Sequence, residues 1–192
     1  MALARILVFG GSIRTGSFSA QLAALAAKEL AILDAEVSLI SLADYPLPIY
    51  DGDLESKKGV PHNAKKLRAT MNEHSGIYIA TPEYNASVPP LLKNTIDWVS
   101  RSGAGGEDPY RRCTFALGAT SNGRFGGYRA LMALRTVLEL GLQALVLPNQ
   151  VAVSHVGEAF DEAGNLKDDT IAKLLRTSLT RLISHCESDY RH

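Results

Sequence analysis

The feature that most constrains the fold of this chain is the regular alternation of short apolar runs with longer segments of helical periodicity. Five such runs recur and most are followed by polar or turn-forming residues: 5–10, 36–40, 76–80, 113–119 and 144–147. Strands without polar–apolar alternation are typical of a sheet that is covered on both faces. We therefore expect five buried strands with helices between them.

The intervening segments repeat apolar residues at the spacing of one helix face. Three stripes carry this prediction: Phe18, Leu22, Leu25 and Ala26 after Ser17; Leu131, Leu134, Val137 and Leu138 before Gly141; and Ile171, Leu174, Leu175, Leu179, Leu182 and Ile183 after residues 168–170. Ser17 is a favourable N-cap residue, and a glycine commonly ends a helix.

Strands that are joined through helices must run parallel, with right-handed crossovers. The pattern therefore predicts one doubly wound α/β domain over residues 1–192. Ligands of such sheets bind beyond the carboxyl ends of the strands. Candidate functional residues are therefore sought directly after each predicted strand.

The first predicted strand leads into "GGSIRTGSFS", residues 10–19. Backbone N–H groups at the start of the following helix favour a phosphate, and the serines and Arg14 add donors. The same residues also suit a simple turn in which Ser17 caps the helix and Arg14 is solvated. The loop lacks the triphosphate-binding and dinucleotide-binding glycine patterns, so a single phosphate monoester such as that of FMN fits it better.

The third predicted strand leads into "TPEYNASVPPLLKNTIDW", residues 81–98. Pro82 restricts the backbone, and the pair Pro89 and Pro90 suits the first turn of a helix. A rigid loop at this edge, with its N–H groups directed outward, suits the polar edge of a flat heterocycle. The alternative is a structural loop in which Ser87 caps the next helix and Tyr84 packs on the surface.

The fourth predicted strand leads into "ATSNGRFGGYRA", residues 119–130. Three glycines in this loop leave room for a ring, although a flexible turn has the same composition. Arg124 and Arg129 have two open interpretations: contact with the 2′-phosphate of NADPH, or solvation.

The two motifs after the first and third strands resemble those of the NADPH-dependent FMN reductase family of flavodoxin-like proteins, and within it the bacterial quinone and chromate reductases. The resemblance covers roughly residues 4–185. It implies a three-layer α/β/α sandwich with a five-stranded parallel sheet of order 2-1-3-4-5. It also implies a tightly held FMN and a homodimer or homotetramer with the flavin near the interface.

The resemblance also implies a set of cofactor-binding residues. Those expected around the phosphate are Ser12, Arg14, Ser17, Phe18 and Ser19. Those expected along the isoalloxazine ring are Pro82, Glu83, Tyr84 and Asn85, and those expected beside it are Ser121, Gly123, Gly126 and Gly127.

The implied activity transfers hydride from NADPH or NADH to FMN, and then two electrons to quinones, azo compounds or chromate by a ping-pong mechanism. FMN carries this chemistry, so no catalytic side chain is expected. The N–H groups of residues 82–85 and 121–123 are candidates to stabilise negative charge on the reduced ring. The alternatives are a free-FMN reductase and a flavodoxin-like electron carrier.

Charge and composition limit the classes of partner that this chain is expected to bind. Lys and Arg total 20, as do Asp and Glu, which argues against nucleic-acid binding and against the acidic face of an electron carrier. No apolar run is long enough to span a membrane, and the start does not resemble a signal peptide, so a cytoplasmic location is expected. The two cysteines show no metal-binding spacing. In segment 43–62, Asp44 and Tyr50 are candidates for lid or subunit contacts, or are simply solvated.

Overall fold

The computed structural model describes residues 3–102 and 107–189. Its centre is a parallel sheet of order β2-β1-β3-β4-β5, with one further strand, β6, that pairs with β4. The strand bounds are β1 (Arg5–Gly10), β2 (Glu36–Ile40), β3 (Gly76–Pro82), β4 (Thr114–Thr120), β5 (Leu145–Val146) and β6 (Val151–Val153). The predicted parallel sheet and its strand order are confirmed.

The predicted fifth strand at 144–147 is present as β5, and a later strand that the sequence did not predict, β6, shares this position in the sheet. Leu145 in β5 pairs with Thr114 at the start of β4, whereas Val151 in β6 pairs with Gly118 near its end. Pro148 lies between the two strands and has no backbone N–H to donate to the ladder. The chain therefore leaves the sheet after Leu147 and returns to it four residues later.

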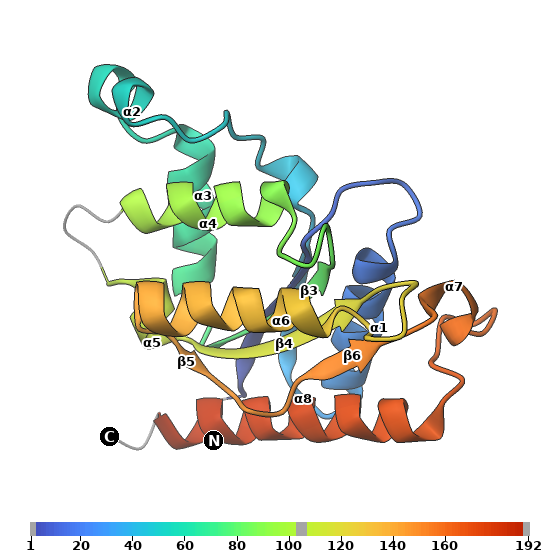
Figure 1. The fold of residues 1–192 in the computed structure, drawn as a ribbon. Coiled ribbons are helices and arrows are strands. Elements are labelled where there is room, and N and C mark those ends of the chain that lie inside the picture. The colour runs from blue at the N-terminus through green and yellow to red at the C-terminus, as the bar shows by residue number, and fades with distance from the viewer. Residues whose placement is uncertain (1–2, 103–106, 190–192) are drawn as a thin grey trace.

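Helices cover both faces of the sheet, as predicted (Figure 1). In β1, the side chains of Ile6 and Val8 belong to the core cluster formed with α1 (Phe18–Ile32) and α8 (Asp169–Asp189). Leu7 and Phe9 point to the opposite face and join the cluster under the helices α3 (His62–Asn72), α4 (Pro90–Arg101) and α6 (Tyr128–Arg135). Shorter elements are η1 (Leu42–Asp44), α2 (Gly52–Lys58), α5 (Pro109–Arg112), the π turn η2 (Thr136–Gly141) and α7 (Val156–Ala159).

The predicted helix boundaries follow from local capping. The Ser17 hydroxyl accepts a hydrogen bond from Ala20 N, 3.4 Å away, at the start of α1. The last apolar stripe begins where Asp168 accepts from the backbone N–H of Thr170 at 2.8 Å. One member of that stripe was misplaced: Leu174 is 46 % exposed, so α8 buries a narrower face than the sequence pattern suggests.

The segment between β2 and α3 is held against α4. Trp98 Nε1 and Asn94 Nδ2 both donate to the carbonyl oxygen of Pro48, at 2.8 and 2.9 Å respectively. The ring of Tyr50 packs edge-on against Trp98, with 5.0 Å between ring centroids. Beyond this anchor, α2 has no buried residue and stands away from the body of the molecule (Figure 1). Tyr50 therefore has an intramolecular role within this chain.

This architecture brings together the loops that follow β1, β3, β4 and β6, because the carboxyl ends of parallel strands share one edge of a sheet. The loops after β1, β4 and β6 lie on the right-hand side of Figure 1. In the described part of the chain, no helix combines the length and the apolar character needed to cross a membrane.

Candidate functional site

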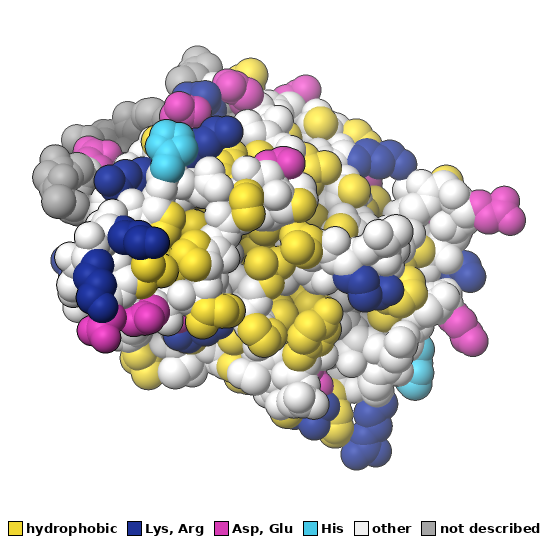
Figure 2. Space-filling model, turned by 90° about the horizontal axis from the view of Figure 1, so that it is seen from above, with side chains coloured by type: hydrophobic (Ala, Val, Ile, Leu, Met, Phe, Trp, Pro, Cys, Tyr) yellow, Lys and Arg dark blue, Asp and Glu magenta, His cyan; other side chains and the backbone are white. Residues whose placement is uncertain are grey.

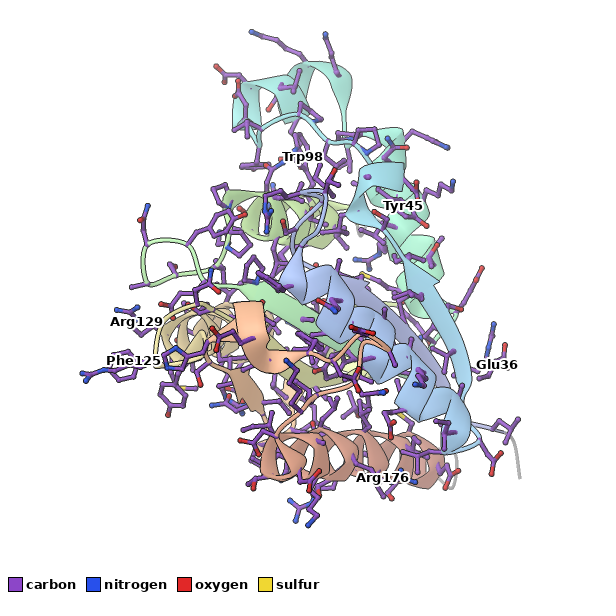
Figure 3. All side chains as sticks on the ribbon, turned by 90° about the vertical axis from the view of Figure 1, so that its right-hand side faces the viewer. Glu36, Tyr45, Trp98, Phe125, Arg129 and Arg176 are labelled. Carbon is purple, nitrogen blue, oxygen red and sulfur yellow. The ribbon has the colours of Figure 1, made fainter. Side chains whose placement is uncertain are left out.

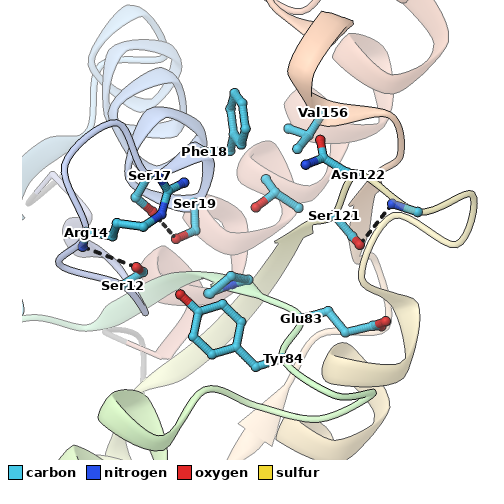
Figure 4. Close-up of a pocket in the computed structure, with 13 residues that line it drawn as sticks. Ser12, Arg14, Ser17, Phe18, Ser19, Glu83, Tyr84, Ser121, Asn122 and Val156 are labelled. Atoms are coloured by element: carbon cyan, nitrogen blue, oxygen red, sulfur yellow. Dashed lines mark hydrogen bonds between the residues drawn. The ribbon is translucent and has the colours of Figure 1, made fainter.

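A pocket of about 290 Å³ opens at the carboxyl edge of the sheet, between the loops after β1, β3, β4 and β6 (Figure 4). Its lining residues are Ser12, Arg14, Ser17, Phe18, Ser19, Pro82, Glu83, Tyr84, Thr120, Ser121, Asn122, Gly123 and Val156. Ten of the thirteen cofactor-binding residues expected from the sequence are among them. Asn85, Gly126 and Gly127 are not.

The β1–α1 loop forms one wall of the pocket. Gly10 allows this loop to lie close to α1, since a Cβ atom at this position would stand 3.1 Å from the backbone of Ala20. The hydroxyls of Ser17 and Ser19 are 2.9 Å apart and share one hydrogen bond. Arg14 is exposed, and among the described residues its guanidinium donates only to the carbonyl oxygens of Thr15 and Gly16, at 3.2 and 3.4 Å.

The donors of this wall fit a phosphate. The backbone N–H groups of Phe18 and Ser19 begin α1 and have no acceptor within the described residues. The first turn of α1 contains no acidic side chain that would compete for them. Together with the hydroxyls and Arg14, these N–H groups form a set of donors that suits a dianion at a helix N-terminus.

The β3–α4 loop forms a small hairpin at the pocket mouth. Tyr84 and Ser87 exchange two backbone hydrogen bonds of 3.0 Å each. Asn85 and Ala86 take φ angles of 48° and 63° at the turn between them. This geometry carries Asn85 to the exposed tip and leaves Tyr84 along the pocket, with its hydroxyl end directed towards the β1–α1 loop (Figure 4). Ser87 therefore does not cap α4, whose N-cap residue is Pro89.

Glu83 lines the pocket with its stem, but its carboxylate is directed to the start of α6 (Figure 4). One carboxylate oxygen accepts from the backbone N–H groups of Arg129 and Ala130, at 3.1 and 3.4 Å. The other accepts from the Arg129 guanidinium, with Nε at 3.0 Å. Burial opposes ionisation of this side chain, which is only 4 % exposed, but the hydrogen bonds and the charge of Arg129 outweigh it and lower the pKa of Glu83.

Glu83 is thus a positioning residue that caps α6 and joins the β3–α4 loop to the first turn of α6. The sequence placed it along the ring because it follows β3, and its position in the chain did not reveal the direction of its carboxylate. The same ion pair contradicts the interpretation of Arg129 as simply solvated, because this side chain is bound to Glu83.

The β4–α6 loop contains three glycines with two different roles. A Cβ atom on Gly126 would stand 2.8 Å from the backbone of Ala152 and Ser154, and one on Gly127 would stand 2.7 Å from Ala119 Cβ. Both glycines also have positive φ angles, of 60° and 87°. These two glycines let the loop pack against β6 and β4. Glycine is therefore required at these positions for close packing of the backbone, and not for space beside a ring as the sequence suggested. Gly123 alone borders the pocket.

Three pocket residues were not found from the sequence: Thr120, Asn122 and Val156. Val156 follows β6, and the strand-end rule would have found it if the run 151–153 had been assigned as a strand. Asn122 lies in the quoted loop motif, and its Oδ1 accepts from Gly157 N at 3.1 Å. This bond joins the loop after β4 to α7.

The backbone donors near the ring side of the pocket are fewer than predicted. Tyr84 N donates to Ser87 O, Ser121 N to Val153 O, and Gly123 N to the hydroxyl of Ser121. The N–H groups that have no acceptor within the described residues are those of Glu83, Asn85 and Asn122. Within that same part of the chain, no group of three His, Cys, Asp or Glu side chains is arranged to hold a metal ion.

The strand order and the ligand pocket at the carboxyl edge define a flavodoxin-like α/β protein. Among solved structures, the flavoenzyme NAD(P)H:(acceptor) oxidoreductase of Paracoccus denitrificans superposes with a TM-score of 0.76 at 25 % identity, covering 97 % of this chain and 98 % of that one. An NADH:FMN oxidoreductase in its apo form superposes with a TM-score of 0.71 at 19 % identity, covering 95 % and 89 % of the two chains, and it shows the same fold.

The family model for NADPH-dependent FMN reductases matches residues 4–158, and the chain belongs to this family. An NAD(P)H-dependent FMN reductase of Pseudomonas aeruginosa is 34 % identical over 93 % of this chain and 92 % of its own. A quinone reductase of Escherichia coli is 35 % identical over 74 % of this chain and 73 % of its own. The predicted family is confirmed, and with it an oxidoreductase that works with FMN and NAD(P)H.

Proposed function

We propose that this chain holds FMN in the pocket and uses it for NAD(P)H-dependent, two-electron reduction of quinones and similar small acceptors. The observation that carries the proposal is the composition of the pocket wall after β1: hydroxyls, a guanidinium and N–H groups without acceptors, with no competing acid. The relatives named as quinone reductases support the choice of acceptor.

The β1–α1 loop would bind the FMN phosphate. The N–H groups of Phe18 and Ser19 and the hydroxyls of Ser12, Ser17 and Ser19 would donate to the phosphate oxygens. Ser17 would then act twice, because its hydroxyl also caps α1. Arg14 would turn from the loop carbonyls to the phosphate, exchanging two exposed neutral hydrogen bonds for charge-assisted ones.

The opposite side of the pocket would hold the flat ring. Pro82 and Tyr84 offer apolar surface on the β3 side, and Ser121 and Gly123 border the β4 side. The N–H groups of Glu83 and Asn122 remain available to the polar edge of the ring. When bound, FMN accepts hydride from the nicotinamide and passes two electrons to the acceptor. Glu83, the carboxylic acid in the lining, has a lowered pKa and is bound to α6, so it does not serve as a proton donor to the ring or the acceptor.

We also propose that the chain assembles as a homodimer or homotetramer with the pocket mouth near the interface. Ile13 and Tyr84, which stand at the mouth, are 54 % and 43 % exposed. The face that is uppermost in Figure 1 carries further hydrophobic side chains gathered near its middle (Figure 2). Light scattering coupled to gel filtration measures the assembly, and a monomer at micromolar concentration would contradict this part of the proposal.

The test of the main proposal is the absorption spectrum of the purified protein, reconstituted with FMN and passed through gel filtration. We expect flavin bands that co-elute with the protein, bleach on anaerobic addition of NADPH or NADH, and return on addition of a benzoquinone. Flavin that separates from the protein while NAD(P)H oxidation depends on added FMN would instead indicate a free-FMN reductase. Absence of flavin binding and of flavin reduction would overturn the proposal.

A further inference from the structure

Two arginines flank one aromatic ring beyond the rim of the pocket. The guanidinium carbon of Arg124 lies 4.7 Å from the ring centroid of Phe125, and that of Arg129 lies 5.5 Å from it. All three side chains are exposed and belong to the β4–α6 loop or the first turn of α6. Figure 3 shows Phe125 and Arg129 projecting from the same region of the surface.

The two guanidinium groups differ in their electrostatic pairing. Arg129 is neutralised by Glu83, which is nearly buried and ionised. Arg124 has neither a carboxylate within ion-pair distance nor a hydrogen-bond acceptor among residues 3–102 and 107–189. A guanidinium that lies against an aromatic ring is held by its face and keeps its N–H groups free for a further partner. Arg124 is therefore a cation in a defined place with its donors unused.

The loop that carries Arg124 is fixed on both sides. On one side, Gly123 donates its N–H to the hydroxyl of Ser121 at 3.2 Å and borders the pocket. On the other side, Gly126 packs directly against the backbone of β6 and accepts no side chain without displacement. Arg124 thus stands one residue outside the pocket lining, where a bound substrate that fills the pocket with one end would extend over the rim.

We propose that Arg124 binds the 2′-phosphate of NADPH and thereby makes the protein prefer NADPH over NADH. This inference rests on the proposed function. NADPH and NADH share the reacting nicotinamide and differ by one phosphate monoester on the adenosine ribose. An unpaired cation away from the reacting ring is suited to discriminate between them, because it forms charge-assisted hydrogen bonds with the additional phosphate. Arg124 meets this description, while Arg129 is neutralised and Arg14 faces the proposed FMN phosphate.

The experiment compares Arg124→Gln with Arg111→Gln in the FMN-loaded protein. Arg111 is exposed on α5, which precedes β4 and so lies at the opposite edge of the sheet, and its replacement removes the same net charge. Anaerobic stopped-flow reduction of the flavin gives the apparent affinity for NADPH and for NADH. Calorimetric titration with adenosine 2′,5′-bisphosphate and with 5′-AMP measures binding without any turnover.

We expect Arg124→Gln to weaken NADPH and adenosine 2′,5′-bisphosphate by about tenfold, while NADH and 5′-AMP change less than twofold. Arg111→Gln should leave all four unchanged within twofold, and Arg124→Lys should retain part of the preference. An unchanged NADPH-to-NADH ratio in Arg124→Gln, or an equal loss for both nucleotides, would overturn the inference. Failure of both nucleotides to reduce the flavin of the unmodified protein would instead contradict the proposed function.

Discussion

Glu83 offers the sharpest test of how the site is built, because a structural role and a ligand role predict opposite results. Glu83→Gln preserves the shape of the side chain but removes its charge. Loss of the charge-assisted cap on two N–H groups of α6 costs about 1 kcal/mol, and loss of the ion pair costs ~0.5–1 kcal/mol, because Arg129 is 55 % exposed. For a chain of this length, the sum lowers Tm by ~3–8 °C.

The assay is thermal unfolding of the apo protein, with FMN affinity measured separately by fluorescence titration. Glu162→Gln is the matched control, since Glu162 is an exposed acid on the surface. We expect the control to leave Tm unchanged, and Glu83→Gln to lower Tm while FMN affinity falls only a few-fold. An unchanged Tm with a large loss of FMN affinity would refute the positioning role and make Glu83 a direct ligand.

The pH dependence of this difference follows from the direction of the pKa shift. The folded structure lowers the pKa of Glu83 below its ordinary value of 4.5. Its contribution to stability is therefore fully present above the pKa of the unfolded chain and is lost as the pH falls through the folded-state pKa. The difference in Tm between the unmodified protein and Glu83→Gln should be constant near neutral pH and should shrink in acid below pH 4.5.

Three further experiments test other parts of the structure. Arg14→Ala should raise the Kd for FMN about tenfold, as measured by fluorescence titration, and an unchanged Kd would remove Arg14 from the phosphate site. Gly126→Ala should lower the free energy of unfolding, measured in urea, by ~2 kcal/mol or more. Gly123→Ala is the control: its added Cβ atom would have its nearest neighbour, Ser121 Oγ, at 3.5 Å, so it should change this free energy by less than ~0.5 kcal/mol. Equal effects of the two substitutions would contradict the packing argument. Tyr78→Phe should stabilise the protein by ~1 kcal/mol in the same assay, because it removes a buried hydroxyl that has no hydrogen-bond partner among the described residues. A loss of stability would instead show that this hydroxyl forms a hydrogen bond.

The strands β1, β3 and β4 were predictable because they are buried on both faces and therefore appear as nearly continuous apolar runs, whereas the edge strand β2 is not buried as expected. At the fifth position the apolar run ends before Pro148 and predicts β5 but not β6, and each of these two strands is only two or three residues long. Strands of this length owe their conformation to pairing with β4, which is a long-range contact that no local pattern reports. The pocket residue Val156, which depends on β6, was missed for this reason.

The site was predictable to the extent that a residue's role depends on its distance from a strand end. Ser12, Ser17 and Tyr84 follow their strands closely, and the fold places them in the pocket. Which groups are already bonded depends on tertiary contacts. Tyr84 N and Ser121 N lie in the right loops, yet each already donates to a backbone carbonyl.

Arg124 in the β4–α6 loop and Arg129 in α6 show that the role of a side chain can depend on tertiary pairing that the sequence does not reveal. Arg124 and Arg129 have the same chemistry and approach the same ring, so the sequence gives no reason to separate them. Glu83, 46 residues before Arg129 in the chain, separates them by neutralising one. Among the described residues, an acid that fixes α6 to the β3–α4 loop thereby leaves Arg124, and not Arg129, without a carboxylate partner. Glu83→Gln should therefore free Arg129 as a second cation and tighten binding of adenosine 2′,5′-bisphosphate without tightening binding of 5′-AMP, as measured by calorimetric titration.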